Sequence, residues 1–177
     1  MDEEQLMSVI GWEFPGGTFT IEPYEHWLMC DAVGTEPTRR GVANPMYVYY
    51  GALGGMGISL DELFAKVGAT ADDGVMFGEA GIDAYRPLEI GSTYTVAGRI
   101  TDIVRKSGKR AGVFDIVTFV LALTDDSGAT VGESTNSFVF PRREQPRRLD
   151  PTTAHDDSPT WATRSRSESS SRSMPRR

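Results

Sequence analysis

Few side chains in this sequence can do acid–base or nucleophilic chemistry at neutral pH. His26 and His155 are the only histidines and Cys30 is the only cysteine, so no disulfide and no His/Cys zinc site can form within one chain. A lone histidine on an amphipathic helix, as expected for His26, is more often a surface or boundary residue than a base. A lone cysteine in an apolar helix is most often a small core residue.

Carboxylates are the other candidates. Glu79 and Asp83 alternate along one predicted strand and therefore share a face. Paired carboxylates can act as acid and base, but a solvated strand face explains them equally well. Asp115 differs because it lies in an apolar run, where an ionised carboxylate needs a partner. We expect it either in solvent at the strand start or paired with an arginine such as Arg99.

The glycine-rich run GALGGMG, residues 51–57, resembles a phosphate-binding fingerprint only superficially. It lies inside a helical apolar pattern and does not follow a strand, as a dinucleotide-binding loop must. Glycine weakens a helix interior by about 1 kcal/mol relative to alanine. The glycines therefore indicate a break in the helix and the close approach of another backbone or of a ligand.

The stretch 44–68 that contains these glycines is predicted to be the centre of the fold. One helix begins at Asn44-Pro45, and a second begins with a capping box of Ser59 and Glu62 and ends at Gly68. Apolar residues recur there at three- and four-residue steps, which places them on one helix face. These residues are Met46, Tyr47, Tyr50, Leu53, Leu60, Leu63, Phe64 and Val67.

The periodicity of the sequence changes from 3.6 to 2 after residue 68. Strands are predicted at 75–85, 92–104, 113–124 and 130–140, after an earlier short strand at 18–21 and a helix that opens at Pro23 and ends at Gly34. The run 113–124 is apolar on both faces, so we expect a helix on one face and another copy of the sheet or a partner subunit on the other. The predicted class is α+β, an antiparallel sheet wrapped around one central helix.

Composition divides the chain into two parts. Residues 1–141 contain 9 basic and 20 acidic residues, a net charge of −11, whereas the rest contains 9 arginines and 5 acidic residues, a net charge of +4. An acidic domain argues against a nucleic-acid groove. Residues 144–177 are rich in Arg, Ser, Thr and Pro and are predicted to be disordered. No hydrophobic run is long enough to span a membrane and the N-terminus is acidic, so we expect a cytoplasmic protein.

Residues 74–109 contain a recognisable sequence motif. It consists of Tyr85-Arg86-Pro87-Leu88, Gly91, Ile100-Thr101-Asp102 and Lys106-Ser107-Gly108, in this order. The motif resembles the MaoC-like hot-dog family, specifically its N-terminal (FAS1-like) dehydratase type, over residues 10–141. The resemblance implies a single hot-dog domain at 1–143, followed by the tail at 144–177.

The resemblance also implies an activity. Members of the family bind acyl thioesters of coenzyme A or acyl carrier protein and add water reversibly to a 2-enoyl chain, without a further cofactor. In the hydratase branch an Asp and a His act from a D-x-N-P-x-H segment. Here Asn44-Pro45 matches, but Val42 and Tyr47 stand at the Asp and His places. We therefore expect no catalytic residue in this chain and a catalytic hot-dog hydratase subunit as its partner, in a heterodimer or heterotetramer.

The hypothesis from the resemblance is thus a non-catalytic, acyl-chain-binding subunit of an enoyl-CoA or enoyl-ACP hydratase (3-hydroxyacyl-thioester dehydratase). An alternative is a homo-oligomeric hot-dog thioesterase or acyl-CoA binding protein, in which Glu36 or Glu79 would act. Arg39 and Arg40 could hold the phosphates of coenzyme A. The residues expected along the acyl tunnel are Tyr47, Tyr50, Gly51, Gly54, Gly55 and Met56.

Overall fold

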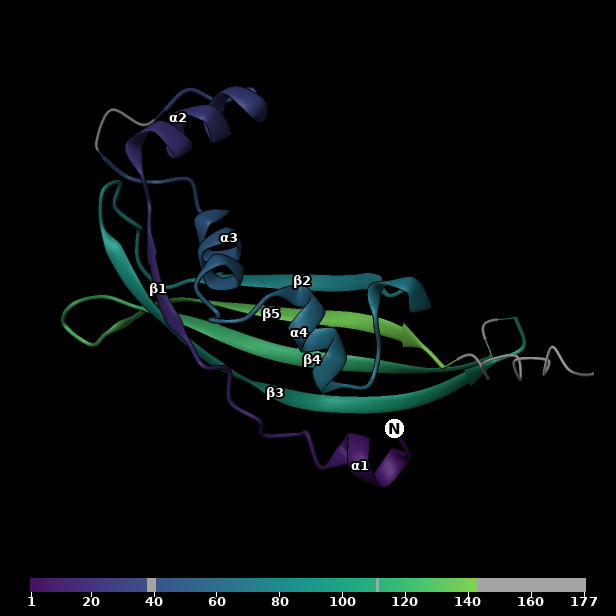
Figure 1. The fold of residues 1–177 in the computed structure, drawn as a ribbon. Coiled ribbons are helices and arrows are strands. Elements are labelled where there is room, and N and C mark those ends of the chain that lie inside the picture. The colour runs from purple at the N-terminus through teal and green to yellow at the C-terminus, as the bar shows by residue number, and fades with distance from the viewer. Residues whose placement is uncertain (38–40, 111, 143–177) are drawn as a thin grey trace, which may run out of the picture. The chain divides into compact units, whose positions relative to one another are not determined.

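A computed structural model describes residues 1–37, 41–110 and 112–142. Five antiparallel strands form one sheet in the order β1-β3-β4-β5-β2, and helix α3 (Tyr47–Gly54) contacts all five (Figure 1). The predicted α+β class and all five predicted strands are confirmed. The strands are β1 (Gly17–Thr20), β2 (Met76–Ala84), β3 (Thr93–Gly108), β4 (Gly112–Thr124) and β5 (Thr130–Pro141).

The predicted helices are also present, as α2 (Pro23–Ala32), α3 and α4 (Leu60–Lys66). The capping box of α4 is formed as expected: the Ser59 N–H donates to Glu62 Oε2 at 2.8 Å, and the Glu62 N–H donates to Ser59 Oγ at 3.2 Å. Gly68 ends the helix with a φ of +68°. Helix α1 (Glu3–Met7) and the 3-10 turn η1 (Ala71–Asp73) were not predicted, because elements this short leave no periodic pattern.

Glycines within α3 and at its C-cap, Gly55, allow the helix to approach the strands closely. A Cβ on Gly51 would lie 3.0 Å from a ring carbon of Phe19 in β1, and one on Gly55 would lie 2.4 Å from Val96 Cγ2 in β3. Real Cβ atoms essentially never lie within 3.0 Å of such an atom, so Gly55 has no room for a methyl group, and the contact at Gly51 would be tight. A Cβ on Gly57 would lie 2.4 Å from the backbone oxygen of Gly16, so the predicted close approach of another backbone is confirmed at this glycine. At Gly51 and Gly55 the approaching atoms belong to side chains of the sheet.

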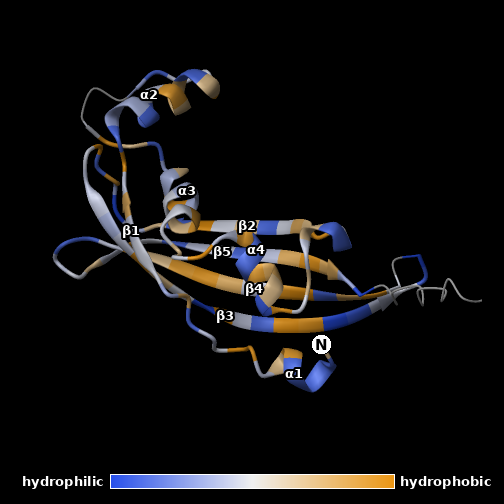
Figure 2. Ribbon diagram, viewed as in Figure 1, coloured by the Kyte–Doolittle hydropathy of each residue, from blue (hydrophilic) through white to orange (hydrophobic). Residues whose placement is uncertain are grey.

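The two faces of the sheet differ in burial. We call the face under α3 and α4 the inner face, and the opposite one the outer face. Along β4 the inner side chains, from Asp115 to Leu123, are buried, and the alternating outer ones are half-buried. Hydrophobic residues dominate this strand (Figure 2). The apolar character of both faces, predicted for this run, is thus present, and the outer side chains are only partly covered within one chain.

Asp115 is completely buried on the inner face of β4 and is paired with two arginines. Its carboxylate accepts from Arg105 Nε at 2.7 Å and from Arg142 Nε at 2.5 Å. Arg142 also donates to the carbonyls of Val67 and Gly68 at the end of α4. The prediction of a paired carboxylate is correct, but Arg99 is not the partner because it lies on the outer face, where it lines a hollow with other outer side chains.

This cluster predicts how stability responds to acid. Burial alone would raise the pKa of Asp115, but hydrogen bonds from Arg105 and Arg142 outweigh it and hold this pKa below its ordinary value. A carboxyl whose pKa is lowered in the folded state stabilises the fold above its unfolded pKa of about 3.9 and loses that contribution as the pH falls through the folded pKa. Urea unfolding of the native chain and Asp115→Asn should therefore differ by a constant amount between about pH 5 and 8 and converge below about pH 4. A difference that grows in acid would contradict this assignment.

Candidate functional site

An apolar pocket of about 370 Å³ lies between helix α2, the start of α3 and strand β1. This volume is at the small end of the range for ligand pockets, which are mostly apolar with a few polar groups. Its polar groups come from one carboxylate and two phenols. The lining residues are Phe19, Glu25, Met29, Ala32, Val33, Tyr47 and Tyr50. We call this the α2–α3 pocket.

His26 connects the two helices that form the pocket. It is 2% exposed, so the expectation of a surface or boundary position is wrong. Its Nε2 accepts from the backbone N–H of Asn44 at 3.1 Å, and its ring stacks on Tyr47. The lone pair a base would need is therefore used to hold the turn that leads into α3. Cys30, with its sulfur 3.6 Å from Nε2, is buried beside it, as expected.

Tyr47 stands where the hydratase pattern has a histidine, and it is 4% exposed. Burial, and the nearby carboxylate of Glu25, raise the pKa of Tyr47, so the phenol stays protonated. Val42, at the place of the hydratase aspartate, lines a second pocket of about 340 Å³ at the other side of the α3 start, with Pro45 and Val48. The two positions thus carry no acid–base pair and line different pockets.

The residues predicted along the acyl tunnel separate into two groups. Tyr47 and Tyr50 line the α2–α3 pocket. Gly51 and Gly54 lie against the ring of Phe19, Gly55 lies against Val96, and Met56 is buried in the core. The tunnel remains a prediction for these four, and Arg39 and Arg40 lie outside the described residues.

Sequence reasoning missed the contribution of α2 to the pocket. Glu25, Met29, Ala32 and Val33 recur at steps of four, three and one, which is the spacing of a helix face. Tyr24, Trp27 and Leu28, which are more hydrophobic and also recur at helical spacing, obscure this signal in the sequence. Those three side chains are instead 63%, 57% and 53% exposed. The more hydrophobic face of α2 therefore points outward, and hydropathy alone would select the wrong face.

The two carboxylates of the thioesterase alternative lie elsewhere. Glu36 is exposed in the loop after α2. Glu79 is exposed on β2, and its backbone N–H donates to Ser137 Oγ at 3.1 Å. Neither lines the α2–α3 pocket.

Strand β2 is an edge of the sheet. In the described part of the chain it pairs with β5 alone, from Met76↔Val139 to Ala84↔Gly132. Met76 and Phe77 are 55% and 52% exposed. A long edge strand with exposed apolar side chains is a template for pairing with another chain.

Solved structures with similar folds include hot-dog dehydratases. The ChsH1–ChsH2 complex from Mycobacterium tuberculosis matches with a TM-score of 0.61 and 14% identity over 81% of this chain and 93% of that one. A MaoC-like dehydratase matches at 0.59 and 17% identity over 76% and 43%. The HadBC (3R-hydroxyacyl-ACP dehydratase) complex, also from M. tuberculosis, matches at 0.51 and 18% identity over 72% and 93%.

At these identities the likeness establishes the fold: the chain has the hot-dog fold of MaoC-like dehydratases. No protein-family model and no curated protein matches the sequence. Among the described residues, none of the helices has the length and apolar character of a membrane span.

Proposed function

We propose that this chain is the non-catalytic, acyl-chain-binding subunit of a heteromeric enoyl-thioester hydratase or 3-hydroxyacyl-thioester dehydratase, acting on CoA or acyl-carrier-protein substrates. The observation that carries the proposal is the start of α3. The Asn44-Pro45 turn of the hydratase pattern is present, and His26 accepts a hydrogen bond from its backbone. Val42 and Tyr47, however, occupy the places of the acid–base pair. Hydration needs a group to activate water and one to donate a proton, so a partner subunit supplies both.

The α2–α3 pocket is the proposed acyl site. Apolar side chains from β1 and α2 form most of its wall, and the protonated phenol of Tyr47 offers one hydrogen-bond donor to a ligand. Burial of an alkyl chain there is favourable by about 0.8 kcal/mol per CH₂ group. The pocket is open to solvent, which suits a ligand whose carrier end is held by another subunit.

The free edge of β2 is the proposed contact with the catalytic subunit. Pairing along this edge would continue the sheet into the partner and cover Met76 and Phe77. Two structural neighbours, ChsH1–ChsH2 and HadBC, are complexes of two different chains, which supports a hot-dog partner.

The test is reconstitution with a hot-dog subunit that has an intact D-x-N-P-x-H segment. The chain alone should leave 2-enoyl-CoA unchanged, and the complex should hydrate it. Ala32→Trp, which fills the α2–α3 pocket, should lower kcat/KM by about tenfold or more for a long acyl chain, the effect of losing roughly 1.4 kcal/mol of acyl binding.

Leu28→Trp is the matched control, because it adds the same side chain to the exposed side of the same helix. It should leave kcat/KM unchanged, and both variants should still form the complex. Hydratase activity in the purified single chain would refute the proposal. Equal kinetics for the two variants would exclude the α2–α3 pocket as the acyl site.

A further inference from the structure

The outer face of the sheet has a raised apolar row near one end. The strand register places Val104 opposite Ile116, Ile116 opposite Val139, and Val139 opposite Met76. The row therefore crosses β3, β4, β5 and β2. Val104 and Met76 are 39% and 55% exposed, and the two residues between them are half-buried. A continuous row of this kind is unusual on a solvent-facing surface.

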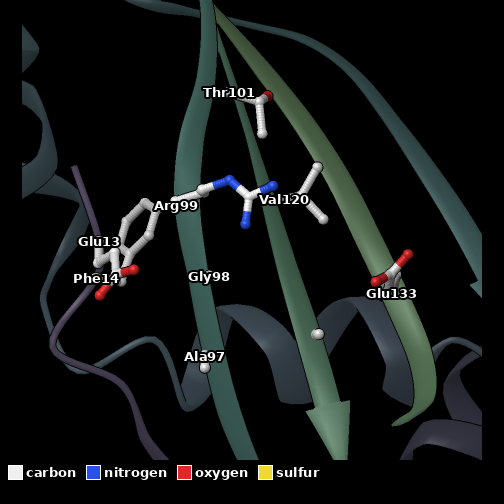
Figure 3. Close-up of a pocket in the computed structure, with 9 residues that line it drawn as sticks. Glu13, Phe14, Ala97, Gly98, Arg99, Thr101, Val120 and Glu133 are labelled. Carbon is white, nitrogen blue, oxygen red and sulfur yellow. The ribbon is translucent and has the colours of Figure 1, made fainter. Parts of the chain in front are cut away.

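The other end of the same face is hollow. A depression of about 470 Å³ lies over β3 and β4, where the floor is formed by the small residues Ala97, Gly98 and Ala122. The side chain of Arg99 extends over β4 toward Val120, between Glu13 on one side and Glu133 on the other (Figure 3).

The apolar row and the hollow lie at equal distances, counted in residues, on opposite sides of one set of paired residues. Ile100, Phe119 and Asn136 pair across β3, β4 and β5. Along β4, Ile116 and Ala122 are each three residues from Phe119. Along β3, the bulge beside Ile100 separates Asp102 from Arg99. Consider a second copy related by a two-fold axis that runs along this row, parallel to the sheet. In such a pair, Ile116 of one copy faces Ala122 of the other, and Asp102 of one copy faces Arg99 of the other.

One pair of oppositely charged residues on the outer face follows the same symmetry. Arg99 and Asp102 are both exposed on the outer face. In the described part of the chain, neither side chain forms a hydrogen bond or an ion pair. In such a pair of copies, each would lie over its opposite charge.

We propose that the outer face packs against the outer face of a second copy of this chain, in antiparallel orientation. Val104 and Ile116 of each copy enter the hollow over Ala97 and Ala122 of the other. Two symmetry-related Asp102–Arg99 pairs form at the sides. Such an interface is isologous, with the same residues on both sides, and has the geometry of two sheets packed face to face about 10 Å apart.

The symmetry of the face favours a second copy over an unrelated partner. A partner that covers this face must have a hollow that receives the apolar row and a projection that fills the hollow. The outer face of a second copy has both features. The residues that carry the test, Arg99, Asp102 and Ala122, lie on β3 and β4, away from the α2–α3 pocket and from the free edge of β2. The outcome of this test is therefore independent of the proposed function.

Analytical ultracentrifugation of the full chain tests the proposal. The native chain should be a concentration-dependent dimer. Arg99→Asp and Asp102→Arg should each raise the dissociation constant about 100-fold or more, because each places like charges in contact across the interface. The double variant Arg99→Asp with Asp102→Arg should restore the dimer, since the pairs form again with exchanged signs.

Two further variants complete the experiment. Ala122→Trp fills the hollow and should also dissociate the dimer. Asp126→Arg makes the same charge change in the exposed β4–β5 turn and should not. Thermal unfolding of each variant confirms that it is folded. A chain that stays monomeric, a dimer insensitive to the single charge reversals, or a double variant that fails to recover would each overturn the proposal.

Discussion

Replacing Asp115 with alanine is expected to lower the free energy of unfolding by about 3–5 kcal/mol, the usual cost of breaking a buried ion pair by removing one partner. Arg142 would lose the carboxylate that it contacts, and Arg105 would keep only its pair with the exposed Glu3, at 3.3 Å. Because Arg142 also holds the carbonyls of Val67 and Gly68, the end of α4 would loosen as well. One substitution would thus weaken the attachment of β3, β4 and α4 to one another.

Urea titration followed by circular dichroism measures this loss. Asp126→Ala is the control, because Asp126 is an exposed aspartate in a turn, and such surface changes usually stay within about 0.5 kcal/mol. Arg142→Ala should show part of the Asp115→Ala loss, and the double variant should lose less than the two single losses added together. A loss below about 1 kcal/mol for Asp115→Ala would contradict the structural role of the cluster.

Gly55→Ala is expected to destabilise the chain by about 1–3 kcal/mol, because one added methyl overpacks the contact between α3 and β3. The new Cβ would lie 2.4 Å from Val96 Cγ2 and 2.9 Å from Val96 Cβ. Valine is stiff about χ1 and cannot turn away freely. Gly55 is the C-cap residue of α3 and has a φ of −101°, which alanine also adopts. Replacing glycine by alanine at such a position is otherwise stabilising, so the sign of the effect is diagnostic.

A double-mutant cycle with Val96→Ala checks the cause. If the clash is with Val96, then Gly55→Ala should cost less in the Val96→Ala background than in the native chain. Gly81→Ala is the control, since a Cβ there would meet its nearest atom at 3.7 Å and should cost little. Stabilisation by Gly55→Ala would show that open space lies beside this glycine, as an acyl tunnel along α3 requires.

The start of α3 explains why the proposed function is binding without chemistry. The hydratase pattern needs the Asp and His side chains to act on one substrate, but Val42 and Tyr47 line different pockets. The only buried histidine in the described residues has its acceptor nitrogen bonded to the backbone of Asn44. What remains around the start of α3 is apolar surface with one protonated phenol, which is suited to hold an acyl chain.

The sequence by itself determined the local structure and the fold. Period-two alternation predicted the four strands after residue 68, and caps and glycines predicted the ends of α2 and α4. These signals depend on residues a few positions apart. The sequence motif around Arg86-Pro87-Leu88 was sufficient to indicate the hot-dog fold. The absence of an Asp and a His beside Asn44-Pro45 was likewise visible in the sequence alone.

Only the tertiary structure shows which residues of these elements contact one another. Asp115 pairs with Arg105 and Arg142 instead of Arg99 because the bulge in β3 and the pleat of the sheet determine which face each arginine occupies. Helix α2 turns its less hydrophobic side inward because His26 must reach the backbone of Asn44. Contacts between residues far apart in sequence depend on how the elements pack, which no local pattern specifies.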